Sequence, residues 1–282
     1  MPTEAILPTR QLTVSLEGIG LLGPGFTNWL TGQAILAGQS GYVPQATVLP
    51  PSTALPPAER RRAGKAVKLA LAIGQEAIVA AGLDPSTLPT VFSSSGGDGY
   101  NCHAICETLA SVDRRISPTR FHNSVHNAPA GYWGIATGAM LPASVLCGFD
   151  ASFGTGLLET VTSVVVDNTR SVLIAYDTDY PEPLRSPRPI FDAFGVALVL
   201  APPGGKGSLV EITVSLVTEP PSRLNDENLE SLRQSIPAAR SLPLLQAIAL
   251  GKSARVVLDY LDTLRLAVEI APLLEKSFET VL

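Results

Sequence analysis

Apolar residues follow two different patterns along the chain, one typical of strands and one typical of helices. Short runs rich in Val, Leu and Ile are typical of buried strands. These runs are residues 12–22, 143–147, 171–176, 195–202 and 208–217. Residues 58–81 instead place Val67, Leu71 and Ile78 on one face of a 3.6-residue period, and Gly82 follows that pattern directly. We predict one long helix there, ended by the glycine.

The remaining pattern predicts further elements between these strands. A strand in residues 90–99 enters a glycine-rich loop and is followed by a helix at 102–110, and another helix is expected at 153–166. Residues 43–57 are rich in proline and predict an extended surface loop. The strands at 195–202 and 208–217 are expected to form a hairpin through PGGKG. Two helices, at 225–235 and 241–250, precede strand-like alternation near the end. Strands alternating with helices indicate an α/β fold.

Composition narrows the function classes. A chain of 282 residues with 45% hydrophobic and 16% charged residues is long enough and apolar enough for a sizeable core. Its net charge of −5, spread without long blocks of one sign, argues against a nucleic-acid partner. Neither a membrane-spanning apolar run nor a signal-peptide pattern is evident, which predicts no membrane insertion and a cytoplasmic location.

The cysteines and histidines predict no metal site. Cys102, Cys106 and Cys147 fit no usual zinc or disulfide spacing, so we expect reduced thiols. Cys102 and Cys106 are expected to be buried on the core face of a helix. His122 and His126 are four residues apart and would share a helix face, but no third ligand is evident.

The segment PASVLCGFDASFGTGLLET predicts a strand that turns directly into a helix. The free amides at a helix N-terminus suit a nucleophile or an oxyanion. A serine hydrolase would place Ser152 here, yet its elbow requires glycine two residues before the serine and a histidine downstream. All three histidines lie upstream of this turn, which argues against hydrolysis.

Several motifs resemble the N-terminal half of β-ketoacyl synthases. They are ERRRAGKAVKLALA, SSSGGDG, SPTRFHNSVHNAPAGYWGIATG and the strand-turn-helix at residues 144–159. FHNSVHNAPAGYW is similar, more narrowly, to the ketosynthase-like chain length factors of aryl polyene pathways. The resemblance covers roughly residues 12–202. It implies a thiolase-like fold with a complete first half, residues 1–205, and an abbreviated second half, residues 206–282, packed on the same core.

The resemblance also implies that the catalytic groups of the family are missing. The family's active cysteine would fall at Asp150 or at Ala151, depending on the side from which the motif is counted. Cys147 lies three or four residues too early. The family's two catalytic histidines belong to its C-terminal half, and this chain has none after His126. The glycine-rich loop that completes the family's oxyanion hole is not recognisable after Gly207.

The resemblance places a partner interface and tunnel lining in the segment around FHNSVHN. The implied residues are Phe121, His122, Asn123, Val125, His126 and Asn127. Tyr132 and Trp133 are either interface anchors or core residues, and Phe153 is a further tunnel candidate. Arg60, Arg61, Arg62, Lys65 and Lys68 either form a solvated face or receive an acidic acyl carrier protein.

The leading hypothesis is a noncatalytic chain length factor that pairs with an active β-ketoacyl synthase subunit, in aryl polyene, polyketide-like or fatty-acid-like elongation. It needs no cofactor, and its partners are the synthase and an acyl carrier protein with its acyl chain. One alternative is an acyl-transfer or hydrolytic enzyme that uses Cys147 or Ser152 with His122 or His126. Another is a structural scaffold for the partner.

Overall fold

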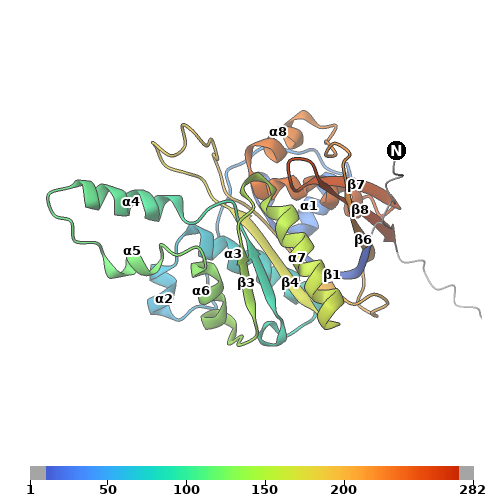
Figure 1. The fold of residues 1–282 in the computed structure, drawn as a ribbon, viewed down its shortest axis with the longest axis horizontal. Coiled ribbons are helices and arrows are strands. Elements are labelled where there is room, and N and C mark those ends of the chain that lie inside the picture. Colours follow the sequence, from blue (N-terminus) through green and yellow to red (C-terminus); the bar gives the residue numbers. More distant parts are fainter. Residues whose placement is uncertain (1–10, 273–282) are drawn as a thin grey trace, which may run out of the picture.

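One mixed sheet of eight strands runs through residues 11–272, the part of the chain that the computed structural model describes (Figure 1). The strands are β1 (Leu12–Leu22), β2 (Thr90–Ser93), β3 (Ala143–Leu146), β4 (Ser171–Asp177), β5 (Phe194–Ala201), β6 (Val210–Val217), β7 (Ala254–Asp259) and β8 (Arg265–Pro272). Their order is β3-β2-β4-β5-β1-β6-β8-β7. β2 is parallel to β3 and β4, and the other neighbours are antiparallel. The α/β prediction is confirmed.

Helices cover both faces of this sheet. They are α1 (Trp29–Leu36), α2 (Pro57–Arg62), α3 (Lys65–Ala81), α4 (Gly99–Ala110), α5 (Pro118–His122), α6 (Ala128–Thr137), α7 (Ser152–Asp167), α8 (Glu227–Ser235) and α9 (Leu242–Ala249). Short 3-10 turns occur at η2 (Phe149–Ala151) and η3 (Pro237–Ser241). None of the helices within residues 11–272 is both long and apolar enough to cross a bilayer.

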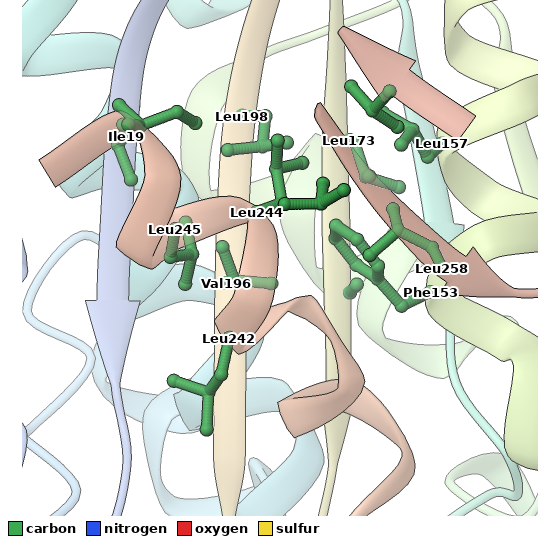
Figure 2. Close-up of a cluster of buried hydrophobic side chains, with 14 of the residues drawn as sticks. Ile19, Phe153, Leu157, Leu173, Val196, Leu198, Leu242, Leu244, Leu245 and Leu258 are labelled. Atoms are coloured by element: carbon green, nitrogen blue, oxygen red, sulfur yellow. The ribbon is translucent and has the colours of Figure 1, made fainter. Parts of the chain in front are cut away.

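Two hydrophobic clusters form the core, one on each face of the sheet. α3 packs Leu69 and Ile73 on one face, with Trp133 of α6 beside them. On the other face, Figure 2 shows Phe153 and Leu157 of α7 gathered with Leu244 of α9. Leu157 is fully buried, which stabilises the fold by roughly 1.5–3 kcal/mol relative to an exposed side chain. β6, β7 and β8 extend the same sheet, and α9 joins the same core.

Glycines set the distance between α3 and β1. A Cβ on Gly18 would meet the carbonyl oxygen of Ala77, and one on Gly20 would meet that of Ile73. The helix backbone therefore lies directly against the strand, where any larger residue would push it away. This close approach fixes α3 over the centre of the sheet.

The predicted helix at residues 58–81 is wrong in one respect, because it is broken in two. Ala63 has an extended backbone, with φ −62° and ψ 120°, and Gly64 is the N-cap of α3. A Cβ at Gly64 would meet the Asp98 carboxylate. Contact with a distant loop thus overrides the helical preference of this segment.

The predicted hairpin of residues 195–202 and 208–217 is also wrong. β5 and β6 both form, but β1 lies between them and pairs with each. Most of β1 is buried, so it requires a partner on both edges, which a two-stranded hairpin would deny it. In addition, the final alternation forms two strands, β7 and β8, which pair with each other.

Residues 99–127, here called the arm, extend away from the body of the molecule (Figure 1). Only Gly99 and Asn101 of α4 are buried, and no residue of α5 is. The arm leaves the sheet at the end of β2 and returns to it through α6. It therefore offers its surface to the outside of this chain.

Candidate functional site

The strand-turn-helix predicted from the sequence is present at residues 146–153. β3 ends at Leu146, η2 follows, and α7 begins at Ser152. Phe149 has a positive φ of 53°, a conformation that a bulky residue rarely adopts outside sharp turns. The Ser152 hydroxyl donates to the Phe149 carbonyl at 2.7 Å and accepts from the Gly148 amide at 3.0 Å. Ser152 thus holds the turn together from inside.

Two arginines hold the side chain of Asp150 at this turn. Its carboxylate lies 2.8 Å from Arg188 Nη2 and 3.2 Å from Arg240 Nη2. The Arg188 guanidinium also lies 3.9 Å from the centroid of the exposed Phe149 ring. Cation–π contacts of this kind add a modest stabilisation. The carboxylate of Asp150 is therefore engaged in structural contacts.

These ion pairs continue into the C-terminal part of the chain. Arg240 of η3 binds Asp259 of β7 at 3.1 Å, and Arg233 of α8 lies 3.3 Å from the same carboxylate. Arg233 also pairs with Glu230 at 2.7 Å, and its hydrogen bonds lower the pKa of Glu230 to about 2. Linked charges of this kind hold their shared geometry better than isolated surface pairs. The turn is thus tied to η3, β7 and α8.

Asp177 makes a second, buried connection at the end of β4. One carboxylate oxygen accepts from the Ser95 amide at 2.8 Å and from its hydroxyl at 2.5 Å, and the other accepts from the Ala238 amide at 2.8 Å. Burial raises the pKa of Asp177 to about 6, although these hydrogen bonds oppose the rise. Asp177 thus joins the loop after β2 to η3.

The candidate nucleophiles and the candidate bases have different hydrogen-bond partners. Cys147 is exposed, and its Sγ lies 3.4 Å from the Ser95 carbonyl oxygen. Ser152 is almost fully buried within the turn. Within residues 11–272, no histidine hydrogen-bonds to either side chain. Nucleophilic catalysis requires a base within hydrogen-bonding distance, and this arrangement does not provide one.

His126 pairs instead with a residue that the sequence did not indicate. Its Nε2 lies 3.1 Å from Ser94 Oγ, while that hydroxyl donates to the Gly96 carbonyl at 2.7 Å. Burial lowers the pKa of His126. Ser94 is only 1% exposed, so this pair is a structural contact below the loop surface. Within the described part of the chain, no group of three metal-ligating side chains forms around His122 or His126.

The candidate interface residues divide by exposure. Phe121 is 68% exposed and Val125 is 52% exposed, and both line an open groove of about 460 Å³ with His122 and Asn127. Tyr132 and Trp133 are buried, and Trp133 fits against Gly74 of α3. Of the two readings of these aromatics, their burial supports core packing.

Two further side chains follow the same division. Phe153 is also buried, in the core beneath α7. Asn123 donates to the Arg62 carbonyl at 2.8 Å and so anchors the arm to α2. Their side chains therefore support this chain's own fold.

The expectation that Cys102 and Cys106 are buried is wrong. Both are exposed on α4. The spacing of four residues does place them on one face of a helix, but that helix belongs to the arm and does not pack on the core. Their thiols are therefore accessible.

Four of the five basic residues predicted to form a face line a cleft of about 500 Å³ between α2, α3 and α5, and Arg60 is not among its lining residues. Arg61, Arg62, Lys65, Lys68 and Arg120 contribute to its walls. Lys65 Nζ lies 2.8 Å from Asp179 and 4.4 Å from the Tyr100 ring centroid. Arg62 pairs with Glu59 at 3.1 Å. The cleft is therefore positively charged, although Glu59 and Asp179 neutralise part of that charge.

Sequence reasoning missed the residues that fix the turn. Asp177 carried a local signal, since an acidic residue directly ends the apolar run SVLIAY. Arg188 and Arg240 carried none, because each meets Asp150 only after folding brings together segments 38 and more residues apart. Contacts of this range leave no periodic pattern in a single sequence.

This chain is similar in structure to chains of solved complexes that contain a ketosynthase. One is a ketosynthase in complex with its chain length factor from Xenorhabdus doucetiae, at TM-score 0.69, 20% identity and coverage of 92% of this chain and 99% of that chain. A second is a type II polyketide synthase acyl carrier protein in complex with its ketosynthase bound to the hexaketide, at TM-score 0.71, 10% identity and coverage of 94% and 100%. The third is the ishigamide ketosynthase and chain length factor, at TM-score 0.69, 12% identity and coverage of 93% and 99%.

These likenesses establish the fold, which is the thiolase-like fold of ketosynthases, as the sequence predicted. No curated protein sequence matches the chain. Residues 35–259 match the family described as β-ketoacyl synthase, N-terminal domain, which is more than half of the sequence. The chain belongs to the β-ketoacyl synthase N-terminal domain family.

Proposed function

We propose that this chain is a noncatalytic chain length factor, which pairs with an active β-ketoacyl synthase subunit and helps to set the length of its product. The observation that carries the proposal is the turn at residues 147–152. Its strand-turn-helix geometry is kept, whereas Asp150 is ion-paired to Arg188 and Arg240 and Ala151 has no reactive group. A kept scaffold without a nucleophile favours a role in assembly over a role in bond formation.

Ala151 is the better candidate for the position of the family's cysteine. It is the N-cap residue of α7, where a side chain meets the free amides of the first helical turn. The Asp150 carboxylate is held in its ion pairs instead. A cysteine at residue 151 would restore the thiol without breaking them.

The partner interface is proposed to comprise the arm and the edge strand β3. β3 pairs only with β2 in the described sheet, so its other edge is open to a further strand. Phe121 and Val125 expose apolar surface beside the groove. Exposed apolar groups near an open sheet edge are typical of an interface with another subunit.

An acyl carrier protein is proposed to approach the basic cleft. Arg61 and Arg120 form no ion pair within residues 11–272, so their charges remain available to an acidic surface. More specifically, we propose a role in aryl polyene synthesis in the cytoplasm. The resemblance of FHNSVHNAPAGYW to the chain length factors of aryl polyene pathways supports this role. No cofactor is required for this role.

Condensation assays with purified proteins test the proposal. The chain alone is expected to produce no condensation from acyl and malonyl carrier proteins, whereas a complex with the partner synthase is active. Replacing the partner's nucleophilic cysteine by alanine should abolish that activity, and Cys147→Ala in this chain should change it less than about twofold. Condensation by the chain alone would contradict the proposal.

The acyl-transfer alternative rests on one observation, the exposure of Cys147. An acyl-thioester probe distinguishes it. We expect no acylated species by mass spectrometry in wild type. A stable acyl adduct that Cys147→Ala removes would instead establish the alternative.

The scaffold alternative is tested at the groove. Val125 is half exposed, so Val125→Trp is expected to leave the fold intact and to shorten the product of the complex. Phe153 is unsuitable for this purpose, because it is 1% exposed and a larger side chain there would disturb the core. Unchanged product length in the Val125 variant would favour the scaffold.

A further inference from the structure

A separate cavity of about 600 Å³ lies on the α3 side of the molecule. It is lined by α3, the end of β1 and the connection through residues 23–53. None of its lining residues belongs to the turn at 147–152 or to the arm. Its volume lies within the range of small-molecule sites. The cavity is therefore distinct from the arm and the turn, and it shares one lining residue, Lys68, with the basic cleft.

The walls of the cavity are more apolar than polar. Leu21, Phe26 and Leu71 line it from the strand, the loop and the helix, and Val48 and Pro50 line it from the connection. Such walls favour a ligand with a hydrocarbon body, because each buried CH₂ group contributes about 0.8 kcal/mol.

A buried polar group without a partner lies in the same cavity. Ser52 is 7% exposed, and its Oγ has no hydrogen-bond partner within the described residues. Leaving a buried hydroxyl unpaired costs about 1–3 kcal/mol. A ligand atom that hydrogen-bonds to Ser52 would remove this cost.

Lys68 supplies positive charge to the cavity. Lys65, one turn earlier on α3, is paired with Asp179, whereas Lys68 forms no ion pair within residues 11–272. Gln75, two turns further along α3, adds an amide to the same lining. Lys68 and Ser52 together suit an oxygen-bearing anionic group.

Glu76 sets the direction of a bound molecule. Its carboxylate accepts from the Leu21 amide at 2.9 Å and the Trp29 amide at 2.6 Å, so both oxygens are engaged by the backbone. Eight helical residues separate Glu76 from Lys68, which is a rise of about 12 Å along α3. An anionic group would therefore lie at the Lys68 end and the hydrocarbon body would extend toward Glu76.

We propose that this cavity binds an amphipathic carboxylate, with its headgroup at Lys68 and Ser52 and its hydrocarbon body against Leu21, Phe26 and Leu71. The site is a second ligand site, and it does not depend on the proposed function. A molecule that occupies it would brace the connection through residues 23–53 against α3.

Calorimetric titration of the full chain with decanoate tests this site. One molecule per chain is expected to bind, and 1-decanol, which lacks the charge, is expected to bind at least about tenfold more weakly. Lys68→Gln and Ser52→Ala should each weaken decanoate binding, Lys68→Gln by about tenfold or more. Ala72→Leu, which fills the cavity from a half-buried position on α3, should abolish it.

Two control variants test whether decanoate binds at this site or is attracted to any basic surface. Lys252→Gln removes an exposed lysine outside the cavity lining, and Arg61→Gln removes an arginine from the basic cleft; neither should change decanoate affinity. Thermal unfolding checks that each variant is folded. Absent binding by folded wild type would overturn the inference, as would equal binding by wild type, Lys68→Gln and Ala72→Leu. Condensation by the chain alone would instead bear only on the proposed function.

Discussion

The turn at residues 147–152 and the arm at residues 99–127 follow neighbouring parallel strands, yet they are held in opposite ways. β2 leads to the arm and β3 leads to the turn, so both segments begin at the carboxyl ends of these parallel strands. Ion pairs and buried hydrogen bonds fix the turn and its surroundings to the C-terminal region. The arm has little buried surface and exposes Phe121 and Val125.

This difference links the turn to the stability of the fold and the arm to assembly with a partner. Side chains around the turn satisfy one another within the chain, so changes there should be measured as lost stability. The apolar side chains of the arm gain nothing from this chain's own core, so changes there should be measured as lost binding. Each prediction below tests one side of this division.

The largest effect is expected at Asp177. Asp177→Ala leaves the Ser95 amide, the Ser95 hydroxyl and the Ala238 amide without their acceptor. Buried donors without partners cost about 1–3 kcal/mol each, so we expect a loss of roughly 4 kcal/mol. Urea unfolding at pH 5 measures it. Asp179→Ala, which removes a pair with exposed Lys65 and a contact with the exposed Tyr100, is the control and should cost less than about 1 kcal/mol.

At the arm, Phe121→Ala combined with Val125→Ser should leave stability unchanged and weaken partner binding. Both side chains are more than half exposed, so the unfolding free energy should change by less than about 0.5 kcal/mol. Affinity for the partner synthase should fall about a hundredfold, because central apolar anchors dominate interfaces. Biolayer interferometry measures this. Val112→Ser at the arm's tip is a matched surface control, and equal losses from both changes would refute the assignment.

The pH dependence of stability should contain a contribution from Asp177. Its pKa in the folded chain is about 6, above the ordinary aspartate value of 3.8, so the folded state binds more protons between these values. Stability from this group is full below pH 3.8 and is lost as the pH rises through 6. Relative to Asp177→Asn, wild type should lose on the order of 2 kcal/mol from pH 4 to pH 7. A difference that is constant with pH would exclude a raised pKa.

The sequence predicted the strands and the turn better than it predicted the contacts between them. Local periodicity was sufficient for β1, for β4 and for α7. It failed where neighbours decide the outcome, as when β1 separated β5 from β6 and when contact with Asp98 broke the helix at Gly64. The candidate site shows the same limit. Asp150 was found by motif, whereas Arg188 and Arg240, which hold it, were not.

The smallest effect is expected from Arg240→Met. Arg240 bridges Asp150 and Asp259, but each carboxylate keeps a second arginine, Arg188 and Arg233 respectively. No charge is left unpaired, so the loss should be about 1 kcal/mol and not that of an orphaned ion. Hydrogen exchange at amides 148–152 should nonetheless accelerate, because the tie between the turn and η3 is cut. Arg255→Met, which removes an exposed pair with Glu219, is the matched control and should affect neither measurement. If exchange at the turn is unchanged in Arg240→Met, the pair between Arg240 and Asp150 does not fix the turn, and its rigidity comes from the Arg188 pair and the Ser152 hydrogen bonds.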